Sequence, residues 1–295
     1  MMDTVIGSVT AKVRVNVRQG APSTQATVIS SLAAGTTVQV IRKIPGENVL
    51  GIADWYGLPN NEFIWAGGVG SFVSEAAQAS VGSARIAPSP MVVDLYHGDS
   101  VESFADAKAA GVMGIIHKAT TGATGTDDKY QSRRQTAIAA GLLWGAYHWG
   151  TAAPIAQQVA NFLNLAKPDG NTLIALDFER MADDQMTIDG VRAFSDAIFQ
   201  ALQRRPVIYS SDLIKTGLGT AVDPFFGSHR LWLAEYNSNP RPQASWPSFW
   251  LWQYTDGATG PGIRTVPGIS GNRVGNVDCN YFDGTPAQLA AQWAS

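Results

Sequence analysis

Two carboxylic acids stand close together at the end of an apolar run. In the segment LIALDFE, Asp177 and Glu179 follow four apolar residues and are separated only by Phe178. In an extended strand, residues i and i+2 point to the same side, with Cα atoms about 6.6 Å apart. Both carboxyls should therefore face one space, in which one of them keeps its proton near neutral pH. A protonated acid beside a carboxylate is the pair that cleavage of a glycosidic bond requires.

The same doublet has simpler explanations. It could be a solvated strand end, or a pair of acids bonded to Arg180 or Lys118. Asp177-Phe178-Glu179 is, however, the only place in the chain where two acids are separated by one residue. It also stands at the end of an apolar run that has the length and composition of a buried strand.

The sequence around the doublet predicts the elements that position it. From residue 91, the apolar runs MVVDLY, VMGIIHKAT, LLWGAYHWG, TLIALDFE and PVIYS alternate with helical patterns over 100–111, 130–141, 153–167 and 187–205. We expect Ser100 to cap the first helix. Strands separated by helices predict parallel pairing. Three more strand-like runs follow, RLWLAEY, SFWLWQYT and VGNVDCNYF, with little room for helices between them. Residues 91–295 are thus predicted to form an α/β barrel of eight strands with at most five helical crossovers.

Each of the first five predicted strands ends in polar residues. Barrel enzymes build their sites at the carboxyl ends of the strands, so these residues are candidates for the site. They are Asp94, then His117 and Lys118, then Tyr147 and His148, then Asp177 and Glu179, and then Tyr209.

Residues 1–75 show a different pattern. Short alternating runs such as AKVRVNV, which should place Val13, Val15 and Val17 on one face, are separated by turn sequences, and no helical period occurs. This pattern predicts a small all-β barrel. Residues 76–90, AAQASVGSARIAPSP, have the small, polar, proline-ended composition of a linker.

The composition excludes several classes of protein. The 295 residues carry a net charge of −3 with scattered Lys and Arg, which argues against binding to nucleic acid or to a membrane surface. Cys279 is the only cysteine, and the four His show no metal-ligand spacing, so we expect neither a metal nor another cofactor.

No membrane or export segment is apparent. The sequence has no run approaching the ~18 apolar residues of a membrane span, and its start, MMDTVIGSVT, does not look like a signal peptide. We expect a chain that is made in the cytoplasm without membrane insertion. The oligomeric state is not indicated.

Eight motifs of the second region carry a family resemblance. In order they are MVVDLYHGD, GIIHKATTG, GAYHWG, ALDFE, RPVIYS, LWLAEYNSNP, WLWQYTDG and VDCNYFDG. Together, over residues 93–284, they resemble glycoside hydrolase family 25, lysozymes (muramidases) that cut the β-1,4 bond of peptidoglycan between N-acetylmuramic acid and N-acetylglucosamine. The resemblance implies a flattened (β/α)5(β)3 TIM-like barrel and bacterial peptidoglycan as the partner.

The resemblance also implies roles for individual residues. Glu179 would be the general acid with Asp177 as its partner, and Asp94 and Asp278 would complete the acidic site. Four aromatic residues would hold the sugars, namely Tyr147, Tyr209, Trp232 and Trp252. The motif DLYHGD departs from the family, which usually has Ser or Asn shortly after the acid, so the neighbours of Asp94 are given no role.

Two further residues are candidates for substrate binding. Glu235 lies after Trp232 near the end of the sixth predicted strand, where it could touch substrate. Lys118 could either pair with a site carboxylate or bind glycan. Whether Asp177 attacks the sugar directly or orients its 2-acetamido group is left open by the sequence, and we favour acetamido assistance with retention.

The first region resembles the bacterial SH3 family through VRVNVRQGAPST, SLAAGTTVQVI and WYGL…FIWAGGV. This resemblance implies a module that binds the cell wall, with a structural spacer as the alternative. The whole chain then looks like a phage or prophage endolysin that acts on the wall after release, or an autolysin secreted by another route. The competing hypotheses are a chitinase-like glycosidase and a glycan-binding protein without activity.

Overall fold

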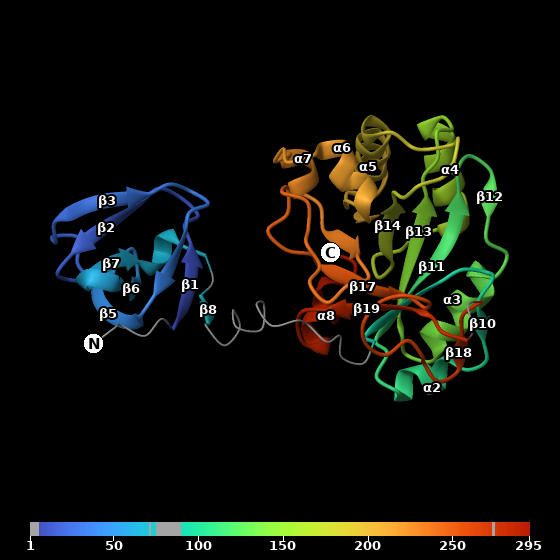
Figure 1. Ribbon diagram of the computed structural model, residues 1–295, viewed down its shortest axis with the longest axis horizontal. Coiled ribbons are helices and arrows are strands. Elements are labelled where there is room, and N and C mark those ends of the chain that lie inside the picture. Colours follow the sequence, from blue (N-terminus) through green and yellow to red (C-terminus); the bar gives the residue numbers. More distant parts are fainter. Residues whose placement is uncertain (1–5, 71, 75–89, 273–274) are drawn as a thin grey trace. The chain divides into compact units, whose positions relative to one another are not determined.

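The computed structural model describes residues 6–70, 72–74, 90–272 and 275–295 (Figure 1). The chain divides into two compact units, Met1–Arg85 and Ile86–Ser295. Apart from Pro90, the linker expected over 76–90 lies outside the described residues. The expected boundaries at residues 75 and 91 therefore stay predictions.

The first unit is built from short antiparallel strands. Its two sheets have the strand orders β3-β2-β7-β6-β5 and β4-β1-β8. Val9, Val17, Val40 and Ile64 are nearly inaccessible to solvent and belong to a single apolar cluster. The strands are β1 (Gly7–Thr10), β2 (Val15–Gln19), β3 (Val28–Leu32), β4 (Thr37–Val40), β5 (Arg42–Val49), β6 (Ile52–Leu58), β7 (Glu62–Trp65) and β8 (Val73–Ser74), with single 3-10 turns at Pro59–Asn61 and Ala66–Gly68.

One expectation for this unit is wrong in detail. The alternation of AKVRVNV predicts one strand with Val13 and Val15 on the same face, but β2 begins only at Val15 and 57% of Val13 is exposed. Ala11 instead forms an isolated bridge with Val69, and the chain bends at Lys12 and Val13. The bend interrupts the strand that the pattern suggests.

The second unit is a mixed α/β fold around a closed sheet of eight strands, which confirms the expected fold class. The strand order is β11-β13-β14-β15-β16-β17-β19-β9, and β9 also pairs with β11. Neighbouring strands are parallel from β9 to β17, whereas β19 runs antiparallel to both of its neighbours. The barrel strands are β9 (Val92–Leu95), β11 (Gly114–Thr121), β13 (Leu143–Trp149), β14 (Leu173–Asp177), β15 (Val207–Ser210), β16 (Leu231–Ala234), β17 (Leu251–Asp256) and β19 (Asp278–Phe282).

Helices surround most of this sheet. In the described residues they occur in every connection from β9 to β16 and are absent between β16 and β17. Within the described part, none is long and apolar enough to cross a membrane. The helices are α2 (Phe104–Ala109), α3 (Tyr130–Ala139), α4 (Ile155–Ala166), α5 (Ile188–Leu202), α6 (Asp212–Leu218), α7 (Pro224–Gly227) and α8 (Pro286–Gln292).

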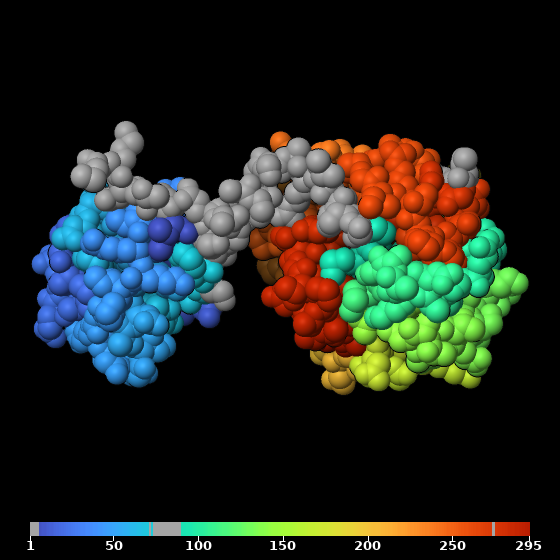
Figure 2. Space-filling model, turned by 90° about the horizontal axis from the view of Figure 1, so that it is seen from below, coloured from blue at the N-terminus to red at the C-terminus, as the bar shows by residue number. Residues whose placement is uncertain are grey.

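The barrel is closed by segments from the two ends of this unit. In Figure 2 the red atoms of the last residues lie beside the teal atoms of residues near 100, in keeping with the pairing of β19 with β9. A second contact of this kind joins β10 (Ser100–Val101) to β18 (Ile269–Ser270). The remaining short strand, β12 (Gly125–Thr126), forms a hairpin with β11.

The pairing of β10 explains an error in the predicted start of the first helix. Ser100 was expected to cap this helix but lies in β10. The cap is Ser103, whose side chain accepts a hydrogen bond from the Asp106 amide at 3.1 Å. Two residues of the expected helix, Ser100 and Val101, therefore tie the first loop to β18.

Side chains alternate between two cores along the barrel strands. Inward residues such as Val92, Ile116 and Leu173 form one cluster. Outward residues such as Val93 and Leu176 belong to another cluster, which includes the apolar faces of the helices. This period of two is what the pleat of a strand imposes.

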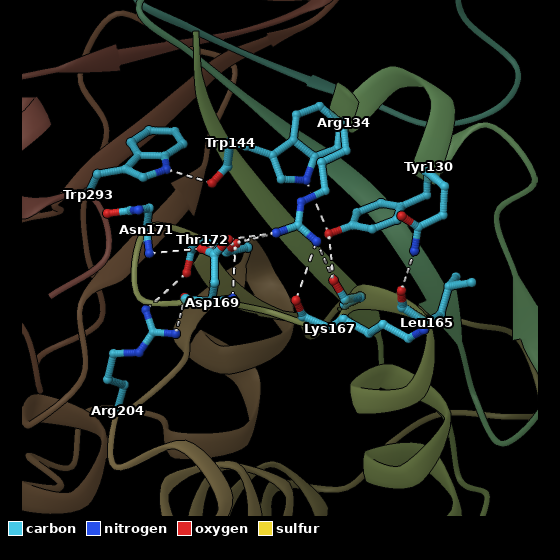
Figure 3. Close-up of polar contacts among 12 residues, drawn as sticks. Tyr130, Arg134, Trp144, Leu165, Lys167, Asp169, Asn171, Thr172, Arg204 and Trp293 are labelled. Carbon is cyan, nitrogen blue, oxygen red and sulfur yellow. Dashed lines mark hydrogen bonds and ion pairs between the residues drawn. The ribbon is translucent and has the colours of Figure 1, made fainter. Parts of the chain in front are cut away.

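Trp293, drawn with Trp144 in Figure 3, packs at the amino ends of β11 and β13. Its side chain is 2% exposed. Its indole Nε1 donates to the Trp144 carbonyl at 2.8 Å. The ring lies so close to β11 that a Cβ at Gly114 would be 2.5 Å from it, so only glycine fits there. Arg204 fixes the neighbouring chain by donating to the carbonyls of Thr172 at 3.0 Å and Ala294 at 2.9 Å.

We predict that Trp293→Ala lowers the free energy of unfolding of the second unit by about 3–5 kcal/mol, because it leaves a cavity at the base of the barrel. Urea denaturation followed by far-UV circular dichroism measures the loss. The control is Val222→Ala, which truncates a side chain that is 71% exposed, and should change the value by less than ~0.5 kcal/mol. Equal effects of the two variants would contradict a closing role for Trp293.

Candidate active site

A pocket of about 360 Å³ lies at the carboxyl ends of the parallel barrel strands. This volume is at the small end of the range for ligand pockets, about 300–1,000 Å³. Among the described residues that line it, Lys118 is the only Lys or Arg. The acids that line it are Asp94, Asp99, Asp177, Glu179, Asp256 and Asp278.

The structure brings eight of the ten predicted site residues to this pocket. The two that it places elsewhere are Glu235 and Trp252. The eight are Asp94, Lys118, Tyr147, Asp177, Glu179, Tyr209, Trp232 and Asp278.

The register of the sheet sets which side chains are neighbours at the rim. Asp278 on β19 pairs with Asp94 on β9, and Asp256 on β17 pairs with Asp278. On the other side of the barrel, Asp177 lies between Trp149 on β13 and Tyr209 on β15. Residues that are almost 200 positions apart in the chain therefore line one space.

Asp177 and Glu179 reach the pocket by a slightly different route from the one predicted. β14 ends at Asp177, so Glu179 lies beyond the strand. The backbone stays anchored because the Phe178 amide donates to the Tyr209 carbonyl at 2.9 Å and the Ser210 hydroxyl donates to the Phe178 carbonyl at 2.7 Å. Phe178 is 2% exposed and packs in the outer core. With Phe178 turned away, both acids line the pocket.

Burial raises the pKa of both acids of this pair. Asp177 is 4% exposed, and its buried Oδ1 has no hydrogen-bond partner in the described part of the chain. Burial, and then the charge of Glu179, raise the pKa of Asp177 well above its ordinary value. Burial also raises the pKa of the partly exposed Glu179. At least one of the two is thus favoured to hold a proton where an exposed carboxyl would have lost it.

Lys118 opposes this effect. Its positive charge lowers the pKa of both Asp177 and Glu179. Its own pKa is lowered by burial, while the two acids act in the other direction. The ammonium Nζ lies 4.0 Å from the centre of the Trp149 ring, within cation-π distance. Lys118 is therefore held at the wall of the pocket as a counter-charge to the pair.

Asp94 is surrounded by N–H donors. Its two carboxylate oxygens accept from Gln253 Nε2 at 3.0 and 2.9 Å, and Oδ1 also accepts from Asn280 Nδ2 at 2.7 Å. Burial raises the pKa of Asp94 to about 7, although these bonds to Asn280 and Gln253 act to lower it. The residue is 8% exposed and lies in the pocket floor.

The two amides are themselves oriented by aromatic donors. Gln253 Oε1 accepts from the hydroxyls of Tyr209 and Tyr236, each at 2.8 Å. Asn280 Oδ1 accepts from Trp232 Nε1 at 2.6 Å. Each amide oxygen therefore faces donors, and each amide nitrogen faces Asp94.

Trp252 is not a sugar platform, which corrects the prediction. It is fully buried on the outward face of β17, where its ring contacts Phe249 and Tyr254. Its neighbour Gln253 takes the inward position, because successive residues of a strand point to opposite faces.

Trp232 lines the pocket but offers little surface to a sugar. It is 2% exposed, and its ring lies edge-on to Tyr209 with centroids 4.6 Å apart and to Tyr147 at 6.4 Å. It supports these tyrosines and Asn280 more than it faces the pocket.

Glu235 lies outside the pocket, contrary to the prediction that it could touch substrate. It forms an ion pair with Lys215 at 2.8 Å and accepts from Asn237 Nδ2 and the Arg241 amide. These contacts hold the loop after β16. Glu235 follows the last inward residue of the strand, and the loop turns its side chain toward α6.

The histidines at the strand ends also point outward. His148 contacts Thr120 Oγ1 at 2.7 Å and Gln158 Oε1 at 3.0 Å, and it stacks on Phe194. Burial lowers its pKa to about 4. His117 is likewise buried on the outer face, where its Nε2 lies 3.0 Å from Arg133.

Sequence reasoning missed several pocket residues. Trp149 and Gln253 could have been found, because each lies two positions after an inward residue of its strand. The same holds for Asn280, which does not line the pocket but binds Asp94. The others lie in loops or at a strand end, where no period applies. These are Tyr96, Asp99, Tyr236, Asp256, Asn272 and Asn276.

The described ranges contain no group of three or more His, Cys, Asp or Glu side chains placed to hold a metal ion. The pocket offers carboxyls, amides and aromatic rings. These groups suit a neutral, hydroxyl-rich ligand and proton transfer to it.

Comparison with known proteins links this geometry to one family. The family model described as glycosyl hydrolases family 25 matches residues 93–263. Lysozyme M1 of Streptomyces globisporus is 26% identical over 243 residues, which cover 76% of this chain and 79% of that protein.

Solved structures have the same fold as the second unit. The muramidase from Acremonium alcalophilum superimposes with a TM-score of 0.58 and 25% identity, over 68% of this chain and 97% of its own. The bacterial lysozyme from Streptomyces coelicolor gives a TM-score of 0.60 with 24% identity, over 68% and 95% of the two chains.

We predict that Lys118→Met raises the pKa of both Asp177 and Glu179, because the ionised carboxyls lose a nearby positive charge. Titration of the ¹³C-labelled carboxyl groups by NMR measures both values. Lys215→Met is the matched control, since Lys215 pairs with Glu235 outside the pocket. This variant should leave the pKa values of Asp177 and Glu179 unchanged. If Lys118→Met also left both titrations unchanged, Lys118 would not be their counter-charge.

Proposed function

Since the chain belongs to glycosyl hydrolases family 25, we propose that this glycoside hydrolase cleaves the β-1,4 bond of peptidoglycan between N-acetylmuramic acid and N-acetylglucosamine. The observation that carries the proposal is the pair Asp177 and Glu179, two acids of raised pKa in one pocket. The relatives named lysozyme and muramidase support the choice of substrate.

Glu179 is proposed as the general acid. It is more exposed than Asp177, so it is the acid of the pair that can meet a glycosidic oxygen. Its raised pKa keeps the proton available at a pH where an ordinary glutamate is ionised. Glu179 gives this proton to the leaving oxygen as the bond from that oxygen to the anomeric carbon breaks, and the bonding electrons stay on the oxygen.

The anomeric carbon then carries developing positive charge. We propose that the carbonyl oxygen of the substrate's own 2-acetamido group bonds to this carbon and that Asp177 holds the acetamido N–H. Asp177 suits this task because it is deeper in the pocket than Glu179 and its Oδ1 has no partner among the described residues. Water, deprotonated by Glu179, opens the resulting ring and restores the original configuration.

Other residues of the pocket stabilise and hold the sugar. Asp94 and Asp278, paired across β9 and β19, supply negative charge opposite the positive charge that develops. Tyr147 and Tyr209, on the two strands that flank β14, also line the pocket. Trp149, with Lys118 against its face, provides a further aromatic wall.

We predict that Glu179→Gln lowers the release of reducing ends from purified peptidoglycan by at least ~10³-fold, because the amide has no proton of suitable acidity to give. Wall binding should persist. Asp183→Asn is the control, since it makes the same chemical change at an exposed acid in the next loop and should keep full activity. Near-parental activity of Glu179→Gln would refute the assignment. Mass analysis of the new ends would separate a muramidase from a glucosaminidase or a chitinase-like enzyme.

We further propose that the first unit is an SH3-like module that holds the enzyme on the wall, and that the chain acts there after release, as phage or prophage endolysins do. The arrangement of this unit supports the module, since it has a small β core of its own and no helix longer than a 3-10 turn in its described residues. The division into two compact units also suits a protein in which one unit binds the wall and the other cleaves it.

One experiment tests both proposals. The chain is expressed in the cytoplasm of a bacterium whose purified wall it digests. Turbidity should stay constant until chloroform permeabilises the membrane and should then fall. Residues 91–295, expressed at the same level, should clear the cells more slowly because they lack the anchor, and Glu179→Gln should not clear them. Clearing before chloroform would contradict action after release, and equal rates with and without residues 1–90 would contradict anchoring.

A further inference from the structure

Gln253 is a pocket residue without a function in the mechanism above. It is 1% exposed and lies on the inward face of β17. A buried side-chain amide needs partners for two donor hydrogens and one acceptor oxygen. Gln253 satisfies all of them within the pocket floor, and its contacts join Asp94 to Tyr209 and Tyr236.

The chemistry of the partners fixes the direction of this amide. The hydroxyls of Tyr209 and Tyr236 both donate to Oε1, which leaves the Nε2 hydrogens for the two oxygens of Asp94. If the amide were turned by 180°, its oxygen would face the oxygens of a carboxylate, and that contact would be repulsive. Two tyrosine hydroxyls therefore select the orientation in which Asp94 receives only N–H donors.

The donors have a consequence for the charge of Asp94. A carboxylate accepts hydrogen bonds at both oxygens, whereas the hydrogen of a protonated carboxyl finds no acceptor in the N–H groups of Gln253 and Asn280. The geometry thus favours the ionised form, although burial opposes it.

We propose that Gln253 is a positioning residue, which holds Asp94 as an anion of fixed orientation through the tyrosine pair Tyr209 and Tyr236. The inference rests on the proposed function, in which Asp94 supplies negative charge opposite the developing positive charge. Asn280 on the neighbouring strand β19, whose amide is oriented by Trp232, donates a further hydrogen bond to Oδ1 of Asp94.

Other ionisable groups also act on Asp94. The carboxyls of Asp99 and Glu179 raise its pKa. The titration of Asp94 must therefore be compared between variants that leave these groups in place. The groups that face or couple to it, besides the two tyrosines, are Asp99, Tyr147, Asp177, Glu179, Asp278 and Cys279.

The test replaces Gln253 by methionine, which is of similar size and has no N–H donor. We expect kcat/KM on soluble peptidoglycan fragments to fall roughly 10- to 100-fold, mainly through kcat, because a hydrogen-bonding group to a buried charge is lost. The pH below which activity is lost should rise by about one unit or more, as Asp94 becomes harder to ionise. In ¹³C NMR, the titration of the Asp94 carboxyl should move up in the same way.

The matched control is Gln243→Met. Gln243 is equally buried, but its amide donates to the carbonyls of Gly219 and Ala221, away from the pocket. This variant should lose stability while the pH profile and the titration of Asp94 stay as in the parent. A merely structural role for Gln253 would make the two variants behave alike.

A second variant serves if Gln253→Met does not fold. The double substitution Tyr209→Phe with Tyr236→Phe removes only two hydroxyls and frees the amide to turn. It should shift the pH profile and the Asp94 titration in the same direction. Parental values for both measurements in the variants that fold would overturn the inference. The NMR titration decides it even if peptidoglycan is not the substrate, whereas activity of Glu179→Gln speaks only against the proposed function.

Discussion

The alternation of side chains in a closed sheet is the constraint on which the site depends. Because neighbouring residues of a strand point to opposite faces, Asp94 can enter the pocket only if Val93 and Leu95 face the helices. The same rule operates on all eight strands, and closure of the sheet brings the carboxyl ends of the seven parallel strands and the amino end of the antiparallel β19 to one rim. A shift of one residue in β9 or β14 would replace an acid of the pocket, Asp94 or Asp177, by an apolar side chain.

The pocket keeps its acids in two different ways. At Asp94, neutral N–H groups take the place of water and sustain a buried negative charge. At Asp177, no such donors reach Oδ1 in the described residues, and the neighbouring Glu179 adds repulsion. The first environment suits an anion and the second a shared proton, so residues of the same type acquire different chemical properties from their neighbours.

Much of the fold could be read from the sequence, because strongly apolar runs and helical periods mark buried elements. The site was predictable wherever an inward position of a strand coincided with a polar residue, as for Asp94, Asp177 and Tyr209. The prediction for Trp252 was wrong because the choice between it and Gln253 depends on the phase of the strand, which the family resemblance did not fix. The prediction for Glu235 was wrong because the position of a loop after a strand depends on the contacts of that loop, here those of Glu235 with Lys215 and Arg241. Tyr96, Asp99 and Asn272 come from loops whose position is set by tertiary structure.

The anchoring of the last residues at the base of the barrel has a practical consequence. Arg204 and Arg230 bind the main-chain carbonyls of Ala294, Gln292 and Ser295 next to the buried Trp293. Ser295 is therefore held at the end of the barrel opposite the acidic pocket. A surface attachment joined at Ser295 through a flexible spacer would leave the mouth of the barrel accessible to long glycan strands, which makes this position a suitable point for immobilising the enzyme.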